Sequence, residues 1–142
     1  MSNRKNLSTF SENALAMMDE RLPAHLEISG LIRAAAAQGG FGTVIAKGER
    51  DAGTILIVTV ERDNPARIWE RMPAMDGTRK WTETKRQDPE KPQEFDDYLT
   101  RRQRQDDDLW IVELELPDLR RFAALQQNWV DLPEETPIWP PT

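Results

Sequence analysis

The stretch TILIVTV at residues 54–60 constrains the fold more than any other part of the chain. In an extended strand, successive side chains point to opposite faces, so Ile55 and Ile57 share one face while Leu56 and Val58 share the other. A strand that is apolar on both faces is typical of the centre of a sheet, where both faces are covered. The sequence therefore predicts a central strand here and a covering layer on each side of it.

A second strand is expected over residues 109–116, LWIVELEL, because its even-numbered positions are all apolar. A strand is also expected at residues 41–47, which are rich in β-branched and aromatic residues, and shorter, more polar strands are expected at residues 67–71 and 79–84. Because parallel pairing needs a long crossover, these closely spaced strands favour an antiparallel meander.

The segment LPAHLEISGLIRAAAAQGG predicts the first helix. Ile28, Leu31, Ile32 and Ala35 follow the spacing of one helical face, and the two glycines at residues 39–40 supply the stop. A glycine inside a helix costs about 1 kcal/mol relative to alanine. Gly30 therefore indicates close packing of this helix on the sheet.

A second helix is expected to begin near Pro92 and to end at Asp106, with Phe95, Tyr98 and Leu99 on its apolar face. A short helix is expected over residues 118–127. With 142 residues the chain is long enough for one ordinary domain. The fold class predicted is α+β, a mainly antiparallel sheet of about five strands with two main helices packed on it.

Three segments are expected in the chain: a flexible leader at residues 1–20, the α+β domain at residues 21–125, and a tail at residues 126–142 that is rich in proline. Covering both faces of the central strand takes more than one small helix. We therefore expect either a homodimer or a tail that folds back on the domain.

The composition excludes several kinds of site. The chain has no cysteine and one histidine, which excludes disulfides, Cys-ligated zinc, thiol nucleophiles and a metal site with two histidines. No Walker, G-x-G-x-x-G or G-x-S-x-G motif is present. We therefore expect no catalytic residue, no cofactor and no bound metal. No apolar run is long enough for a signal peptide or a membrane span, so we expect a cytosolic protein.

A polar cluster is the main candidate site. Gly48 and Gly53 bracket Glu49 and Asp51 in a turn that precedes the central strand, and glycines there allow positive φ. Glu49 and Asp51 are expected to face a basic group, for which Arg33 on the first helix is a candidate. Such an ion pair is as compatible with a structural role as with a binding site.

Two acidic residues, Asp106 and Asp108, complete this candidate cluster. Three adjacent carboxylates at residues 106–108 suit a hard divalent cation, but the spacing of an EF-hand loop is absent. An Asx turn that ends the helix is therefore the favoured interpretation. His25 is interpreted as a packed or hydrogen-bonded side chain, because no partner in the sequence orients it as a base.

A third hypothesis is binding of nucleic acid through the basic residues of two expected helices, Arg101, Arg102, Arg104, Arg120 and Arg121. The net charge of −6 makes unspecific binding to a phosphate backbone unfavourable. The first three arginines also lie at the end of a helix that begins with acidic residues, an arrangement that complements the helix dipole.

Five tryptophans bear on the question of partners. Trp69, Trp81 and Trp110 lie on expected strands and suit the core. Trp129 and Trp139 lie in the tail, where each is either docked on its own domain or offered to a partner protein.

Several segments, taken in order, resemble domain-of-unknown-function family 1491, a set of short alphaproteobacterial proteins. They are the Leu31-Ile32-Arg33 helix, the turn at residues 48–53, Trp81 with Thr82, the helix with Tyr98 and Arg101, and the segment DDDLWIVE at residues 106–113. The resemblance covers roughly residues 21–122. Glu49 stands where the family usually has Asp, and Asp107 stands where Pro is common. The resemblance implies a single α+β domain and no assigned activity.

We therefore expect a non-enzymatic protein that works by protein–protein contact or regulation, as a homodimer. The alternative, from another class, is a small-molecule-binding or hydrolytic protein that uses a shared acidic and basic cluster, Arg33, Glu49, Asp51 and Asp108.

Overall fold

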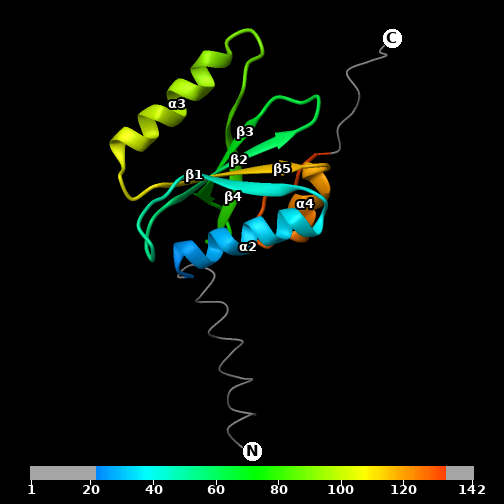
Figure 1. Cartoon of the computed structure of the whole chain (residues 1–142). Coiled ribbons are helices and arrows are strands. Elements are labelled where there is room, and N and C mark those ends of the chain that lie inside the picture. Colours follow the sequence, from blue (N-terminus) through cyan, green and yellow to red (C-terminus); the bar gives the residue numbers. More distant parts are fainter. Residues whose placement is uncertain (1–21, 134–142) are drawn as a thin grey trace, which may run out of the picture.

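The computed structural model describes residues 22–133 (Figure 1). Three helices and five strands make up this part of the chain. The helices are α2 (Ala24–Ala37), α3 (Pro92–Gln105) and α4 (Leu119–Leu125). The strands are β1 (Phe41–Ala46), β2 (Ile55–Glu61), β3 (Arg67–Pro73), β4 (Arg79–Arg86) and β5 (Trp110–Leu116). Both the α+β class and the number of strands are confirmed, while three helices rather than two main ones cover the sheet.

The five strands form one sheet in the order β1-β5-β2-β3-β4. The strand that is apolar on both faces, β2, is central as predicted. β5 lies between β1 and β2, antiparallel to β1 and parallel to β2. The simple meander is therefore wrong at this point. The chain leaves β2, forms the β3–β4 hairpin and α3, and returns as β5, which gives the long crossover that a parallel pair needs.

One face of the sheet is covered by α2 and α4 (Figure 1). Its core joins alternate residues of the strands to the apolar faces of both helices, including Ile57, Trp69, Val112, Leu31 and Phe122. Asp118 begins α4 as its N-cap, with its side chain accepting a hydrogen bond from the Arg121 amide.

The opposite face is covered by α3 (Figure 1). Its core is smaller and joins Leu56, Val58, Ile68 and Ile111 to Phe95 of the helix. Both faces of β2 are thus covered by helices of the same chain.

The chain after α4 folds back on the sheet. Trp129 is 6% exposed, and its ring centroid lies 5.1 Å from that of Trp69 and 5.7 Å from that of Phe122. The backbone N–H of Trp81 in β4 donates to Asn128 O at 2.7 Å, and the Val130 N–H donates to Trp81 O at 3.1 Å. Residues 126–133, which the sequence assigned to the tail, therefore extend the domain core. The predicted leader and Trp139 lie outside the described residues.

Candidate functional site

The turn at residues 48–53 is held by close backbone contact. A Cβ atom added to Gly48 or Gly53 would lie 2.1 Å or 2.3 Å from the carbonyl oxygen of Asp108. Among the described residues, the glycines with positive φ are Gly39 and Gly77, so the prediction of positive φ in this turn is wrong. Glycine is needed at both positions because the loop before β5 approaches too closely for any side chain.

The carboxylate of Glu49 is used within this turn. It accepts hydrogen bonds from the backbone N–H groups of Asp51, at 2.8 Å, and Ala52. The indole N–H of Trp110 donates to Glu49 O at 2.6 Å, and the Glu49 N–H donates to Asp108 O at 3.0 Å. The turn therefore joins the beginnings of β2 and β5.

The same turn anchors the beginning of α2. The N–H groups of Ala24 and His25 donate to Asp51 O and Arg50 O, each at 3.0 Å. His25 Nδ1 lies 3.1 Å from Arg50 O and 3.8 Å from the Asp51 carboxylate. Carbonyl groups of the turn thus satisfy two N–H groups that a helix start leaves without intrahelical partners. His25 is a hydrogen-bonded side chain of this anchor.

The predicted polar cluster is only partly brought together. Arg33 is exposed and lies nine residues after Ala24, about 13 Å further along the helix axis. The Asp106 carboxylate accepts a hydrogen bond from the Asp108 N–H at 2.9 Å, which is the expected Asx turn at the end of α3. In the described part of the chain, no group of three acidic or histidine side chains is arranged to hold a metal ion.

The arginines that are candidates for binding nucleic acid do not form one surface. Arg102 pairs with Glu70, and the Arg101 guanidinium lies 5.9 Å from the centroid of the Tyr98 ring. Arg120 and Arg121 belong to α4, on the opposite face of the sheet from α3 (Figure 1).

A polar cluster that the sequence did not predict holds α3 against the β3–β4 hairpin. The Glu70 carboxylate accepts hydrogen bonds from Thr84 Oγ1 at 2.6 Å and Tyr98 Oη at 3.2 Å, and Arg102 Nη1 also donates to it. Burial acts to raise the pKa of Glu70, but the hydrogen bonds from Thr84, Arg102 and Tyr98 outweigh it and lower that pKa. Three different elements contribute these side chains, so no local pattern marks the cluster. The only available signal was the presence of Tyr98 and Arg102 on one helical face.

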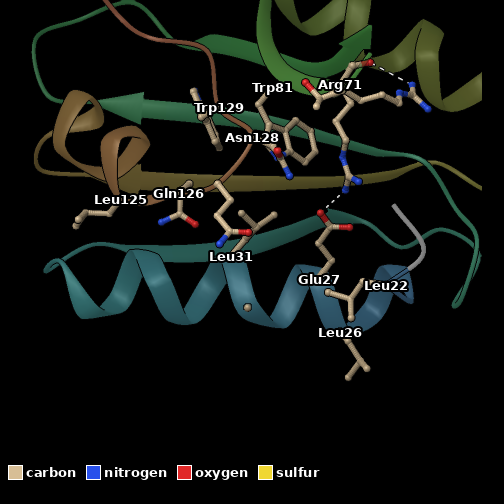
Figure 2. Close-up of a pocket in the computed structure, with 14 residues that line it drawn as sticks. Leu22, Leu26, Glu27, Leu31, Arg71, Trp81, Leu125, Gln126, Asn128 and Trp129 are labelled. Atoms are coloured by element: carbon tan, nitrogen blue, oxygen red, sulfur yellow. Dashed lines mark hydrogen bonds and ion pairs between the residues drawn. The ribbon is translucent and has the colours of Figure 1, made fainter. Parts of the chain in front are cut away.

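A groove of about 730 Å³ lies between α2 and residues 125–129 (Figure 2). Leu31, Trp81 and Trp129 supply apolar surface. Figure 2 shows Arg71 reaching from the sheet to Glu27 on α2, where the two form an ion pair. The Arg71 guanidinium also lies 4.6 Å from the centroid of the Trp81 ring. The groove therefore combines apolar side chains with polar ones, including Gln126 and Asn128, and is charged near the beginning of α2.

Gly30 is one of the residues that line this groove. A Cβ atom added there would meet nothing within 4 Å, so the prediction that Gly30 packs closely on the sheet is wrong. A glycine in a helix costs about 1 kcal/mol relative to alanine, and at Gly30 no close packing contact offsets this cost. The missing side chain leaves the wall of the groove open.

The free edge of β1 is the second unusual surface. β1 pairs only with β5 in the sheet, and its sequence FGTVIA carries no charge. Phe41 is 55% exposed, Val44 40% and Ile45 50%. A bulge interrupts the pairing with β5 between Val44 and Ala46.

Within the described residues, no helix is both long and apolar enough to cross a membrane.

Solved structures show which proteins share this architecture. A crystal structure of a DUF1491 family protein from Caulobacter crescentus is 34% identical and superposes with a TM-score of 0.64, covering 76% of this chain and 98% of its own. The solution structure of protein Atu0922 from A. tumefaciens is 29% identical with a TM-score of 0.61, covering 81% of this chain and 99% of its own. An NMR structure of a DUF1491 family protein from Caulobacter crescentus is 35% identical with a TM-score of 0.58, covering 73% and 92%.

A comparison with curated proteins finds no match. The model of the family described as "Protein of unknown function (DUF1491)" matches residues 22–124, which includes the turn at residues 48–53 and all five strands. The resemblance found in the sequence is therefore confirmed, and the chain belongs to the DUF1491 family.

Proposed function

We propose that this protein acts without catalysis, by protein–protein contact, and that the free edge of β1 is the surface that takes the partner. The observation that carries this proposal is an edge strand that is uncharged, half-exposed and apolar. An unpaired edge presents a row of backbone N–H and C=O groups to any extended chain that approaches it. Strand addition of this kind is a recurrent mode of protein recognition.

The polar groups of the described domain support the same proposal. The Glu49 carboxylate is used by backbone amides of its own turn, and the Glu70 carboxylate is used by Thr84, Tyr98 and Arg102. Both sets of contacts connect elements of the fold to each other. The exposed side chains of β1 include three large apolar ones, and apolar surface suits association.

A fluorescent peptide with the sequence of residues 40–47, GFGTVIAK, tests whether the edge accepts a strand. We expect its anisotropy to rise on addition of the full chain and to rise much less with Val44→Pro, because Val44 lies in the regular part of β1 before the bulge, where proline removes a backbone donor and disrupts strand pairing. Leu125→Lys, at the exposed end of α4, is the surface control. Equal binding to all three proteins, or no binding to any, contradicts the proposal.

A second candidate function, binding of a small molecule, rests on the groove and Gly30. The groove volume of about 730 Å³ lies in the range of ligand sites, ~300–1,000 Å³. Arg71, which pairs with Glu27, lies at one end, and both apolar and uncharged polar side chains line the rest. This arrangement suits a ligand with an apolar body and one carboxylate.

Dodecanoate is a suitable probe for the groove. If the groove takes such a ligand, dodecanoate should change the fluorescence of the tryptophans that line it and should raise the thermal midpoint. Gly30→Leu, which fills the open wall and also favours the helix, should abolish both changes while leaving the fold intact. Responses of the same size in Gly30→Leu would exclude the groove as the site.

A further inference from the structure

We propose that the strand that pairs with β1 is β1 of a second copy of this chain, antiparallel, with the two-fold axis at Thr43. This inference rests on the proposed function and names its partner. Two antiparallel edge strands related by a two-fold axis perpendicular to the sheet continue it from five strands to ten, and each face of one copy continues as the same face of the other.

The sequence of β1 is complementary to itself in this register. The pairing of β1 is regular over residues 41–44, before the bulge at Ile45. Pairing about Thr43 places Val44 opposite Gly42 of the second copy, and the symmetry repeats this contact. Thr43 then lies opposite Thr43 of the second copy, and pairs of threonines are among the favourable cross-strand pairs. An axis at Gly42 would place glycine opposite glycine and would leave Val44 opposite Gly40, which lies outside the strand.

The charge distribution favours the same partner. Each chain carries a net charge of −6, so two copies repel each other on average. A contact between copies is therefore favoured where the pairing strands themselves carry no acidic side chain, and the six residues of β1 include no charge. The other edge strand, β4, has five charged residues in eight, RKWTETKR, and would bring like charges together in a symmetric pair.

No other element of the described fold covers the exposed side chains of β1. The core under α3 includes Ala46 from β1, while Phe41, Val44 and Ile45 stay 40–55% exposed. The bulge near Ile45 adds local twist to the end of the strand. Edge-to-edge pairing would bring the exposed apolar side chains of this strand in the two copies side by side and would bury part of their surface.

Thr43→Lys in the full chain separates association from folding. In a single copy Thr43 lies opposite Glu113 of β5, so a lysine there has a favourable neighbour. In the pair, however, two lysines lie directly opposite each other, which is unfavourable. We expect light scattering to give a dimer for the unmodified chain and a roughly tenfold or greater rise in the dimer dissociation constant for the variant. Met75→Lys, at a fully exposed residue of the β3–β4 turn, should stay dimeric.

The absence of cysteine from the sequence makes a direct test of the register possible. With Thr43→Cys, oxidation should give a covalent dimer that reductant reverses, because residues opposite each other in antiparallel strands lie within reach of a disulfide. Met75→Cys should give little or none under the same conditions.

A chain that is monomeric at all concentrations, with no cross-link at residue 43, overturns the inference. If the GFGTVIAK peptide still binds that monomer, the proposed function stands with another partner; if the peptide does not bind, both fail. A dimer that persists unchanged in Thr43→Lys also overturns the inference, because the contact then lies on another surface.

Discussion

The two edges of the sheet are built differently. β4 carries five charged residues in eight, and the segment around Trp129 pairs with its outer side through the two backbone hydrogen bonds at Trp81. β1 carries no charge, and its apolar side chains are exposed. Charged side chains and a covering segment are two of the devices by which proteins protect an edge from unwanted pairing. One edge of this sheet has both devices, while β1 has only the bulge near its end.

The difference shows that this fold covers part of one sheet edge and leaves the other open. Residues 128–130 cover β4 at Trp81, where the buried Trp129 anchors them. On the β1 side, α2 passes close to Gly42, where an added Cβ would lie 2.8 Å from the Ile32 side chain. The helix therefore packs on the face of β1 and leaves its edge open.

Among the variants that compare the two edges, Trp129→Ala should have the largest effect, since it releases the segment that covers β4 at Trp81. Replacing a buried tryptophan by alanine costs about 3–5 kcal/mol of unfolding free energy, and Trp129 contacts Trp69, Trp81 and Phe122. Urea unfolding measures the loss, and hydrogen exchange at the Trp81 and Val130 amides should become faster. A loss as small as that of a surface substitution would show that residues 126–133 are not part of the cooperative domain.

Trp129→Phe is the matched control for that variant. It keeps a large ring in the core and removes the indole N–H of Trp129, which is buried without a hydrogen-bond partner. An unsatisfied buried donor is costly, so its removal offsets part of the lost packing. We expect Trp129→Phe to change the unfolding free energy by about 1 kcal/mol or less. A loss equal to that of the alanine variant would mean that the N–H group is needed.

Arg102→Met should weaken the attachment of α3 to the hairpin that carries β4. The substitution keeps an apolar stem and removes the ion pair with Glu70 and the hydrogen bond to Tyr98 Oη. A hydrogen bond to a charged group contributes about 1.5–3 kcal/mol, and partial exposure of both side chains reduces this, so we expect a loss of about 1–2 kcal/mol. Arg101→Met, on the same helix, is exposed and should stay within about 0.5 kcal/mol. Equal losses would assign the effect to the helix rather than to the ion pair.

The same cluster predicts a dependence of stability on pH. The pKa of Glu70 in the folded chain is below its ordinary value of 4.5, so the charged carboxylate stabilises the folded state above the unfolded pKa. That stabilisation is lost as the pH falls through the folded pKa. As the pH falls from about 6 to about 3, through the range where ordinary carboxyl groups titrate, urea midpoints should fall more steeply for the unmodified chain than for Glu70→Gln. If the urea midpoint changes with pH equally in both proteins, Glu70 does not contribute to the dependence of stability on pH.

Much of the fold could be predicted from local patterns. The alternation of apolar residues in TILIVTV and LWIVELEL identified β2 and β5, and helical spacing identified α2 and α3. The position of β5 between β1 and β2 could not be predicted, because hydrophobic alternation indicates that a strand is buried but does not indicate which strands pair with it. The third helix is short, and only its burial on the α2 face makes it part of the core.

The candidate site could be predicted less well than the fold. The turn at residues 48–53 was identified, but its glycines are needed for contact with the Asp108 carbonyl, a residue far along the sequence. Glu70 was missed because its partners come from β4 and α3. Trp129 was left open between the core and a partner surface, since the sequence of a tail does not show what it packs against.

Ile45→Lys should have the smallest effect on stability, and it tests the open edge most directly. Ile45 is half-exposed at the bulge of β1, so a lysine there can keep its charge in water. At a concentration where the chain is monomeric, we expect the unfolding free energy to change by about 0.5 kcal/mol or less. Ile57→Lys, at a fully buried position of β2, should instead unfold the chain, because it buries an unpaired charge. If Ile45→Lys destabilises the monomer strongly, the apolar side chains of β1 serve folding, and their exposure no longer points to a partner.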